Sequence, residues 1–125
     1  RTFAEKKNSQ RVTMAEVRAG DIIVRLAKKD DRKRTDHILI VESVDRDDIA
    51  LPLVINYVHS IAWSADGMYN HGVRRGSIKI KDLYGTLTEQ EWTEQGKTGE
   101  QNETFIDALA SETSLHRIHS ITRNK

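Results

Sequence analysis

The sequence predicts an α+β domain in which an antiparallel β-sheet carries flanking helices. Helical signals are confined to the first twenty residues and to a short segment that begins near Thr104. Between them, strand-forming segments follow one another directly, an order typical of an antiparallel sheet with helices on one side. Four segments of strand length are rich in β-branched or alternating apolar residues: 21–26, 37–44, 54–61 and 77–81.

After a polar start, the chain up to residue 26 contains one helical signal and one strand. Thr13 and Glu16 have the spacing of a capping box, in which each side chain satisfies the backbone N–H of the other residue. Gly20 suits the left-handed conformation that ends a helix, so one or two helical turns are expected. Residues 21–26 then form a β-branched run that predicts a buried strand, and the charged residues 28–36 predict a solvated loop.

The middle of the chain predicts a pair of strands around an acidic turn. Residues 37–44 give the strongest strand signal, and Asp45–Asp48 is a turn candidate because Asp side chains bond their own following backbone. Residues 54–61 form the next strand, and Pro52 predicts an irregular start of the edge type. Residues 64–72 are rich in turn-forming residues and are expected to form a loop.

The last third of the chain is more polar. Residues 88–102 are acidic, with Trp92 as the only large apolar side chain, and are expected to be a surface excursion or flexible segment. Thr104 then caps a helix. We therefore divide the chain into residues 1–87, the sheet-bearing portion, and residues 88–125, a polar excursion with a C-terminal helix that packs on the same domain.

The composition argues against several classes of function. The 125 residues include 20 basic and 19 acidic ones, a formal net charge of +1, which provides no concentrated basic face for nucleic acid. No apolar stretch approaches the roughly 20 residues of a membrane span. There is no cysteine, so these residues supply no disulfide, thiolate metal site or thiol nucleophile. The chain begins without Met, and we expect it to be a portion of a longer product.

No metal site or cofactor is expected. His116 and His119 are three residues apart and would share a helical face, as metal ligands sometimes do, but no carboxylate or further His stands at a useful spacing. A hydroxyl nucleophile is also not expected, because Ser60, Ser64 and Ser77 lack a nucleophile-elbow setting.

The histidines of the two central strands, His37 and His59, are the candidate catalytic residues. Opposed residues of a hairpin have position numbers with a constant sum, and a sum of 96 centres the hairpin at position 48, inside the acidic turn. His37 then lies opposite His59, with Cβ atoms about 5 Å apart. Two such imidazoles can form a relay in which the second orients the first. The alternative is a pair of polar edge residues, with a register altered by a bulge near Pro52.

Several motifs in order resemble the NlpC-type cell-wall peptidases and amidases of the papain-like cysteine peptidase superfamily. They are the Gly-Asp-initiated strand at residues 20–24, the His-initiated strand at 37–42, the Tyr-Val-His-Ser segment at 57–60 and Gly-Val-Arg at 72–74. The resemblance covers about residues 1–80. Leu39 departs from it, since the family has a small residue there. It implies a papain-like core, here without its N-terminal cysteine helix, with His37 as the general base and His59 as the orienting residue.

The function implied by this resemblance is a cysteine peptidase or amidase acting on peptide amide bonds, with peptidoglycan stem peptides as substrate. The nucleophile would come from an upstream segment or a second chain that carries the catalytic cysteine, because none is present here. The resemblance also implies a location in the bacterial cell envelope or outside the cell. The alternative is a catalytically inactive binding or structural module that kept the sheet and lost the nucleophile.

Substrate contacts are expected from the segment that follows His59. Trp63, Tyr69 and His71 lie in or near the predicted loop, and binding residues are often found on loops held by a rigid scaffold. We therefore expect these three side chains to line the rim of the cleft that holds the two histidines.

Overall fold

Eight antiparallel strands form one sheet in the order β1-β8-β2-β3-β4-β5-β6-β7. The computed structural model describes residues 9–65 and 68–118, with the backbone alone for 61–65 and 68–71. The strands are β1 (Ser9–Arg11), β2 (Ile22–Leu26), β3 (His37–Arg46), β4 (Pro52–Ala65), β5 (Met68–Lys79), β6 (Glu91–Glu94), β7 (Lys97–Thr98) and β8 (Glu112–Ile118). The helical elements are three 3₁₀ turns, η1 (Met14–Glu16), η2 (Leu87–Glu89) and η3 (Gly99–Gln101), and the α-helix α2 (Glu103–Leu109).

The prediction of an α+β, papain-like arrangement is wrong. The described part of the chain is a small β-rich domain with one α-helix. The expected first helix is only the 3₁₀ turn η1: the Thr13 side chain makes no capping hydrogen bond, and Val17 is already out of the helical conformation, with ψ of 144°. Most of the expected loop at 64–72 belongs to the strands β4 and β5. The expected excursion at 88–102 contains the short strands β6 and β7 and the 3₁₀ turns η2 and η3.

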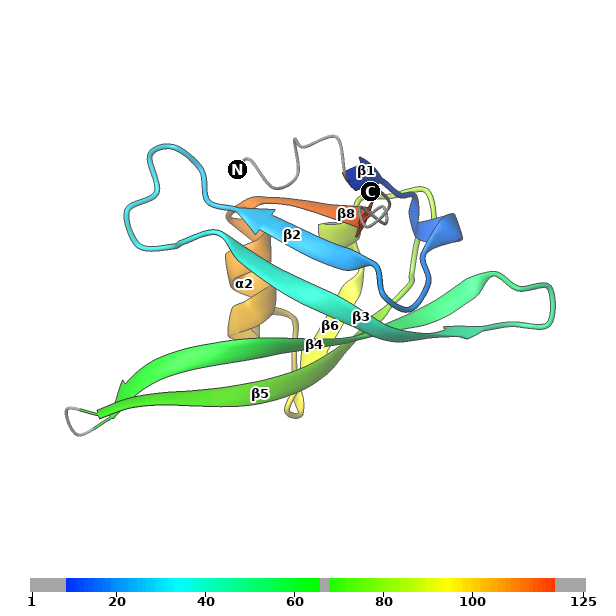
Figure 1. The fold of residues 1–125 in the computed structure, drawn as a ribbon. Coiled ribbons are helices and arrows are strands. Elements are labelled where there is room, and N and C mark those ends of the chain that lie inside the picture. Colours follow the sequence, from blue (N-terminus) through cyan, green and yellow to red (C-terminus); the bar gives the residue numbers. More distant parts are fainter. Residues whose placement is uncertain (1–8, 66–67, 119–125) are drawn as a thin grey trace, which may run out of the picture.

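The sheet curls around a core that α2 covers on one side (Figure 1). This helix contacts both β6 and β8, which lie far apart in the strand order, so the sheet bends around the helix. Asn102 begins α2 by accepting hydrogen bonds from the backbone N–H groups of Thr104 and Phe105. The buried apolar residues come from all the larger strands and from the turns: Val12, Met14, Val17, Ile23, Leu39, Val41, Ile55, Tyr57, Ile78, Leu87, Trp92, Ala108 and Leu115.

The β3–β4 hairpin turns at Asp47, within the predicted acidic turn. The Asp47 carboxylate accepts hydrogen bonds from the backbone N–H groups of Ile49 and Leu51, and Ala50 adopts a positive φ of 69°. Val41 pairs with Tyr57, which is two residues away from the predicted register, and a bulge at Glu42 shifts the pairing again toward the turn. A shift of two residues keeps the side chains of β3 before the bulge on their expected face of the sheet.

The Gly-Asp pair that precedes β2 has a structural role. Gly20 has a φ of +95°, in the left-handed region, and its N–H donates to the carbonyl of Val41. Asp21 is buried and accepts two hydrogen bonds, of 2.8 and 3.0 Å, from the guanidinium of Arg117 on β8. This pair therefore fixes the start of β2 between β3 and β8.

The turn before β6 is held by one buried side chain. Gln90 accepts hydrogen bonds from the backbone N–H groups of Lys81 and Asp82, and its amide donates to the carbonyls of Asp82 and Thr86. Four backbone groups are thus satisfied by one amide, and the turn delivers β6 to the edge of β5 in a fixed register.

Candidate active site

The two predicted catalytic histidines contact each other. Nε2 of His37 lies 2.8 Å from Nδ1 of His59, and the ring centroids are 5.1 Å apart. His37 stands at the start of β3 in the row of Leu39 and Val41, and His59 stands on β4 in the row of Ile55 and Tyr57. Because these rows face the core, the two rings meet at its margin: His59 is buried and His37 is half-buried. The roles of base and orienting residue stay a prediction.

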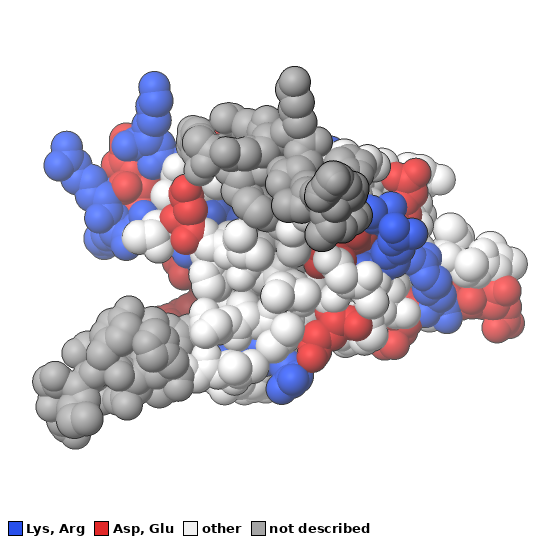
Figure 2. Space-filling model, in the orientation of Figure 1, with Lys and Arg blue, Asp and Glu red and all other residues white. Residues whose placement is uncertain are grey.

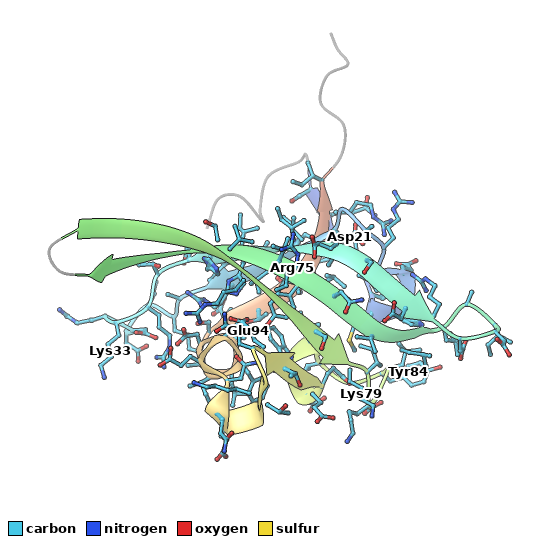
Figure 3. The ribbon with its side chains drawn as sticks, turned by 90° about the horizontal axis from the view of Figure 1, so that it is seen from below. Asp21, Lys33, Arg75, Lys79, Tyr84 and Glu94 are labelled. Carbon is cyan, nitrogen blue, oxygen red and sulfur yellow. The ribbon has the colours of Figure 1, made fainter. Side chains whose placement is uncertain are left out.

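A carboxylate that sequence reasoning missed completes the cluster. Oε1 of Glu94 on β6 lies 3.1 Å from Nε2 of His59 and accepts a 2.6 Å hydrogen bond from the Tyr57 hydroxyl. Glu94 is only 4% exposed. Figure 3 shows it in the interior beside α2, whereas Tyr84, Lys79 and Lys33 lie at the periphery. Glu94, His59 and His37 thus form a continuous chain of hydrogen-bonding groups from the core toward the surface.

Gly76 allows this chain to cross a strand. On β5, Gly76 pairs with Tyr57 of β4 on one side and with Glu94 of β6 on the other. A Cβ at this position would overlap the Tyr57 phenol and lie 2.8 Å from the carbonyl oxygen of Thr93. The absence of a side chain at Gly76 therefore lets the Tyr57 ring pass over β5 and reach Glu94.

Glu94 is ionised at neutral pH. Burial by itself would raise the pKa of Glu94, but the hydrogen bonds donated by His59 and Tyr57 outweigh burial and lower that pKa to about 2. Conversely, burial and the bond to Glu94 raise the pKa of Tyr57 well above its ordinary value. Arg74 adds a further positive charge, with Nη1 3.6 Å from Oε2 of Glu94.

The ionised carboxylate fixes the positions of the protons along the chain. A carboxylate only accepts hydrogen bonds, so Nε2 of His59 must carry the proton that bonds to Glu94. In a neutral His59 ring, Nδ1 is then the acceptor, and the bond between the rings requires Nε2 of His37 to be the donor. Nδ1 of a neutral His37 consequently keeps a free lone pair, and no described group bonds to it.

His37 is held neutral by its surroundings. Burial first, then the positive charge of Arg25 and the interaction with the neighbouring His59 ring, lower the pKa of His37 to about 4. Asp107 and Glu94 act in the opposite direction. At neutral pH the His37 ring is thus a base with an available nitrogen rather than a cation.

The three predicted substrate contacts lie in the β4–β5 hairpin. Trp63 pairs with Asn70 and Tyr69 with Ser64, while His71 pairs with Ala62, so the expected loop is wrong for this segment. The side chains of Trp63, Tyr69 and His71 are outside the described residues, and their predicted contacts stay predictions. In Figure 1 this hairpin extends from the body in the direction opposite to the β3–β4 turn.

The other candidates lie elsewhere. His116 is on the strand β8 rather than on a helix, and its Nε2 lies 2.8 Å from the Ser114 hydroxyl. His119 is outside the described residues. Among the side chains that the structure describes, no three His, Asp or Glu residues converge in a way that would hold a metal ion. On the face shown in Figure 2, basic and acidic side chains are interspersed.

Comparisons with known proteins add no assignment. No protein-family model, no curated protein and no solved structure matches this chain. In the part of the chain that the structure describes, no helix has the length and apolar character needed to cross a membrane.

Proposed function

We propose that Glu94, His59 and His37 form the proton relay of a hydrolase that cleaves peptide amide bonds by general-base catalysis. The observation that carries this proposal is the hydrogen-bonded order of the three groups, with distances of 3.1 and 2.8 Å. A buried carboxylate, an orienting ring and an outer ring with a free nitrogen are the parts that general-base catalysis needs.

In this proposal, Nδ1 of His37 takes the proton of the attacking nucleophile. The proton on Nε2 of His37 then passes over the 2.8 Å bond to Nδ1 of His59. The positive charge comes to rest on His59, where the ionised Glu94 stabilises it at 3.1 Å. Reversal of the two transfers delivers a proton from Nδ1 of His37 to the leaving amine. The relay thus offsets the low basicity of His37 by moving the charge inward.

The nucleophile of the proposed reaction is a thiol from outside these 125 residues, which contain no cysteine. A thiol adjacent to Nδ1 of His37 would become a thiolate as its proton enters the relay. An acyl-enzyme would form with release of the amine, and water would then hydrolyse it. The resemblance of the sequence motifs to cell-wall peptidases makes peptidoglycan stem peptides the first substrates to test.

A second candidate is a binding or structural module without catalytic activity. The observation that favours it is the absence of cysteine from the 125 residues. Under this alternative, the buried Glu94–His59–Tyr57 network specifies the packing of β4 and β6 and has no chemical role.

The test uses the full-length product, or this chain together with the segment or subunit that carries a cysteine. His37→Ala should lower the turnover of small peptidoglycan-type peptides by about 10²-fold or more, the scale of a lost general base. His59→Gln should cost less, because His59 does not touch the nucleophile. Ser77→Ala, on β5 beside Gly76, is the control and should leave turnover unchanged.

Two outcomes would contradict the proposal. Full activity of His37→Ala in the complete protein would exclude the relay from catalysis. A complete protein without cysteine would exclude the thiol mechanism and leave the binding module as the better account.

A further inference from the structure

We propose that Arg25 is a positioning residue of the relay, which fixes the segment before His37 and neutralises Asp107 so that the outer ring stays an uncharged base. The inference rests on the proposed function, because it assigns Arg25 a task within that same site. Its evidence is a set of contacts around His37 that the relay itself does not use.

Arg25 is the direct cross-strand neighbour of His37. The two residues pair in the β2–β3 register, so their side chains lie on the same face of the sheet. Arg25 is 9% exposed, which is unusual for a cation. Its Nη2 donates a 2.9 Å hydrogen bond to the carbonyl of Thr35, two residues before His37. This hydrogen bond ties the end of the loop to β2 beside the His37 ring.

Arg25 also faces a carboxylate of the helix. Its Nη1 lies 3.6 Å from Oδ2 of Asp107 on α2. Nε of Arg34 donates a 2.7 Å hydrogen bond to the other oxygen of Asp107, and Nη1 of Arg34 bonds Asp31 at 3.0 Å. The charged loop at residues 28–36, predicted to be solvated, is thus clamped to α2 next to the site.

The charges that face His37 come from every neighbouring element. Arg25 on β2 and His59 on β4 disfavour a positive His37, while Asp107 on α2 and Glu94 on β6 favour it. Arg34, Asp31 and Asp36 of the loop lie close enough to Arg25 to act on its charge. Glu94 is screened by His59, which lies between it and His37. Arg25 opposes a positive charge on His37 directly and shares the Asp107 carboxylate with Arg34.

The consequence is a relay that stays ready in mild acid. With Arg25 in place, His37 remains uncharged at pH 5 to 6, where an ordinary histidine takes up a proton. Without Arg25, the positive charge that opposes the imidazolium would be lost, and Asp107 would be neutralised by Arg34 alone. The His37 ring would then take up a proton in mild acid, and in that form it could not accept the proton of a nucleophile.

The test is an NMR titration of the His37 ring in the 125-residue chain. Arg25→Gln removes the charge but keeps a donor for the Thr35 carbonyl, and Arg25→Met removes both. Both variants should raise the pKa of His37 by about one unit or more, the scale of a nearby charge. Arg25→Lys keeps the charge and should hold the pKa of His37 within about 0.3 unit of the wild-type value. Arg34→Met is the matched control, because it removes a cation from the same cluster without touching β2.

The result that overturns the inference is an unchanged His37 titration in Arg25→Gln. A rise in Arg34→Met equal to that in Arg25→Gln would also overturn it, because the effect would then belong to the whole cluster. If Arg25→Met fails to fold, Arg25→Gln and Arg25→Lys still give the comparison. The titration needs no substrate, so an inactive complete protein would refute the proposed function and leave this result standing.

Discussion

Replacing Gly76 by Ala tests how the site is assembled across three strands. The added Cβ would overlap the hydroxyl end of the Tyr57 ring and lie 2.8 Å from the Thr93 carbonyl oxygen. The ring is fully buried and the carbonyl belongs to the β6 ladder, so neither has room to move. Tyr57 must therefore leave its place over β5, and its 2.6 Å hydrogen bond to Glu94 must break.

The cost of Gly76→Ala follows from these two effects. Overpacking a dense core costs about 1–3 kcal/mol. Loss of a hydrogen bond to a buried charged group costs about 1–3 kcal/mol more. Ala is favoured over Gly in a strand by roughly 0.5–1 kcal/mol, and this preference offsets part of the two costs. The free energy of unfolding should fall by about 2–4 kcal/mol, a large fraction of the stability of a domain of this size.

The measurement is urea unfolding of wild type, Gly76→Ala and Ser77→Ala. Ser77 is the next residue of β5 and faces the other side of the sheet, so its substitution should change the free energy of unfolding by less than about 0.5 kcal/mol. A Gly76→Ala protein as stable as Ser77→Ala would refute the reasoning, because it would mean that Tyr57 does not pass over β5.

Three further predictions concern pH, the turn before β6 and the start of α2. The free energy of unfolding should fall by about 1–2 kcal/mol between pH 6.5 and pH 4, because His37 takes up a proton in the unfolded chain in this range but not in the folded chain. This magnitude allows for solvent screening around the half-buried ring. Urea titrations of His37→Gln should lack this part of the pH dependence. Gln90→Glu, which cannot donate to two backbone carbonyls, should cost about 2 kcal/mol in thermal unfolding, whereas the exposed Gln101→Glu should be neutral. Asn102→Ala should cost about 1 kcal/mol, the loss of a helix cap, and a melting temperature equal to wild type would contradict the assigned cap.

The meeting of His37 and His59 could be predicted from the sequence because it depends on local rules. Two strands around an acidic turn form a hairpin, and side chains alternate between its faces. The register was wrong by two residues, since the hairpin turns through Asp47–Leu51 and contains a bulge at Glu42. The error preserved the face of each ring, so the rings still lie within hydrogen-bonding distance.

Glu94 could not be predicted in the same way because its partners are distant in sequence. It lies 35 residues after His59, in a segment whose polar composition resembles a surface loop. Two signals were present. Trp92 is an apolar residue among polar ones, and Gly96 suits a hairpin turn. In the structure, Gln95-Gly96 makes that two-residue turn with both φ angles positive. Neither signal identifies β5 as the partner strand, which depends on the packing of Trp92 in the core.

The predicted first helix and the predicted loop at residues 64–72 were wrong for physical reasons. The Thr13–Glu16 spacing predicts a helix start, but only one 3₁₀ turn follows. Met14 and Val17 are both buried in the core, and the backbone has already left the helical conformation at Val17. Residues 64–72 contain turn-forming side chains, yet their backbones pair in register from Ala65–Met68 inward. Strand formation depends on context more than on the intrinsic preference of each residue, so composition predicted a loop where the ladder continues.

The position of the protons in the Glu94–His59–His37 chain tests the central claim most directly. Nitrogen-15 NMR of the imidazole rings distinguishes the two neutral tautomers and the imidazolium. At pH 7 we predict a proton on Nε2 of both rings and a free Nδ1 on His37, and we predict that Glu94→Gln weakens the preference of His59 for this tautomer. A proton on Nδ1 of neutral His37 in the wild-type chain, with the same spectrum in Glu94→Gln, would contradict the relay.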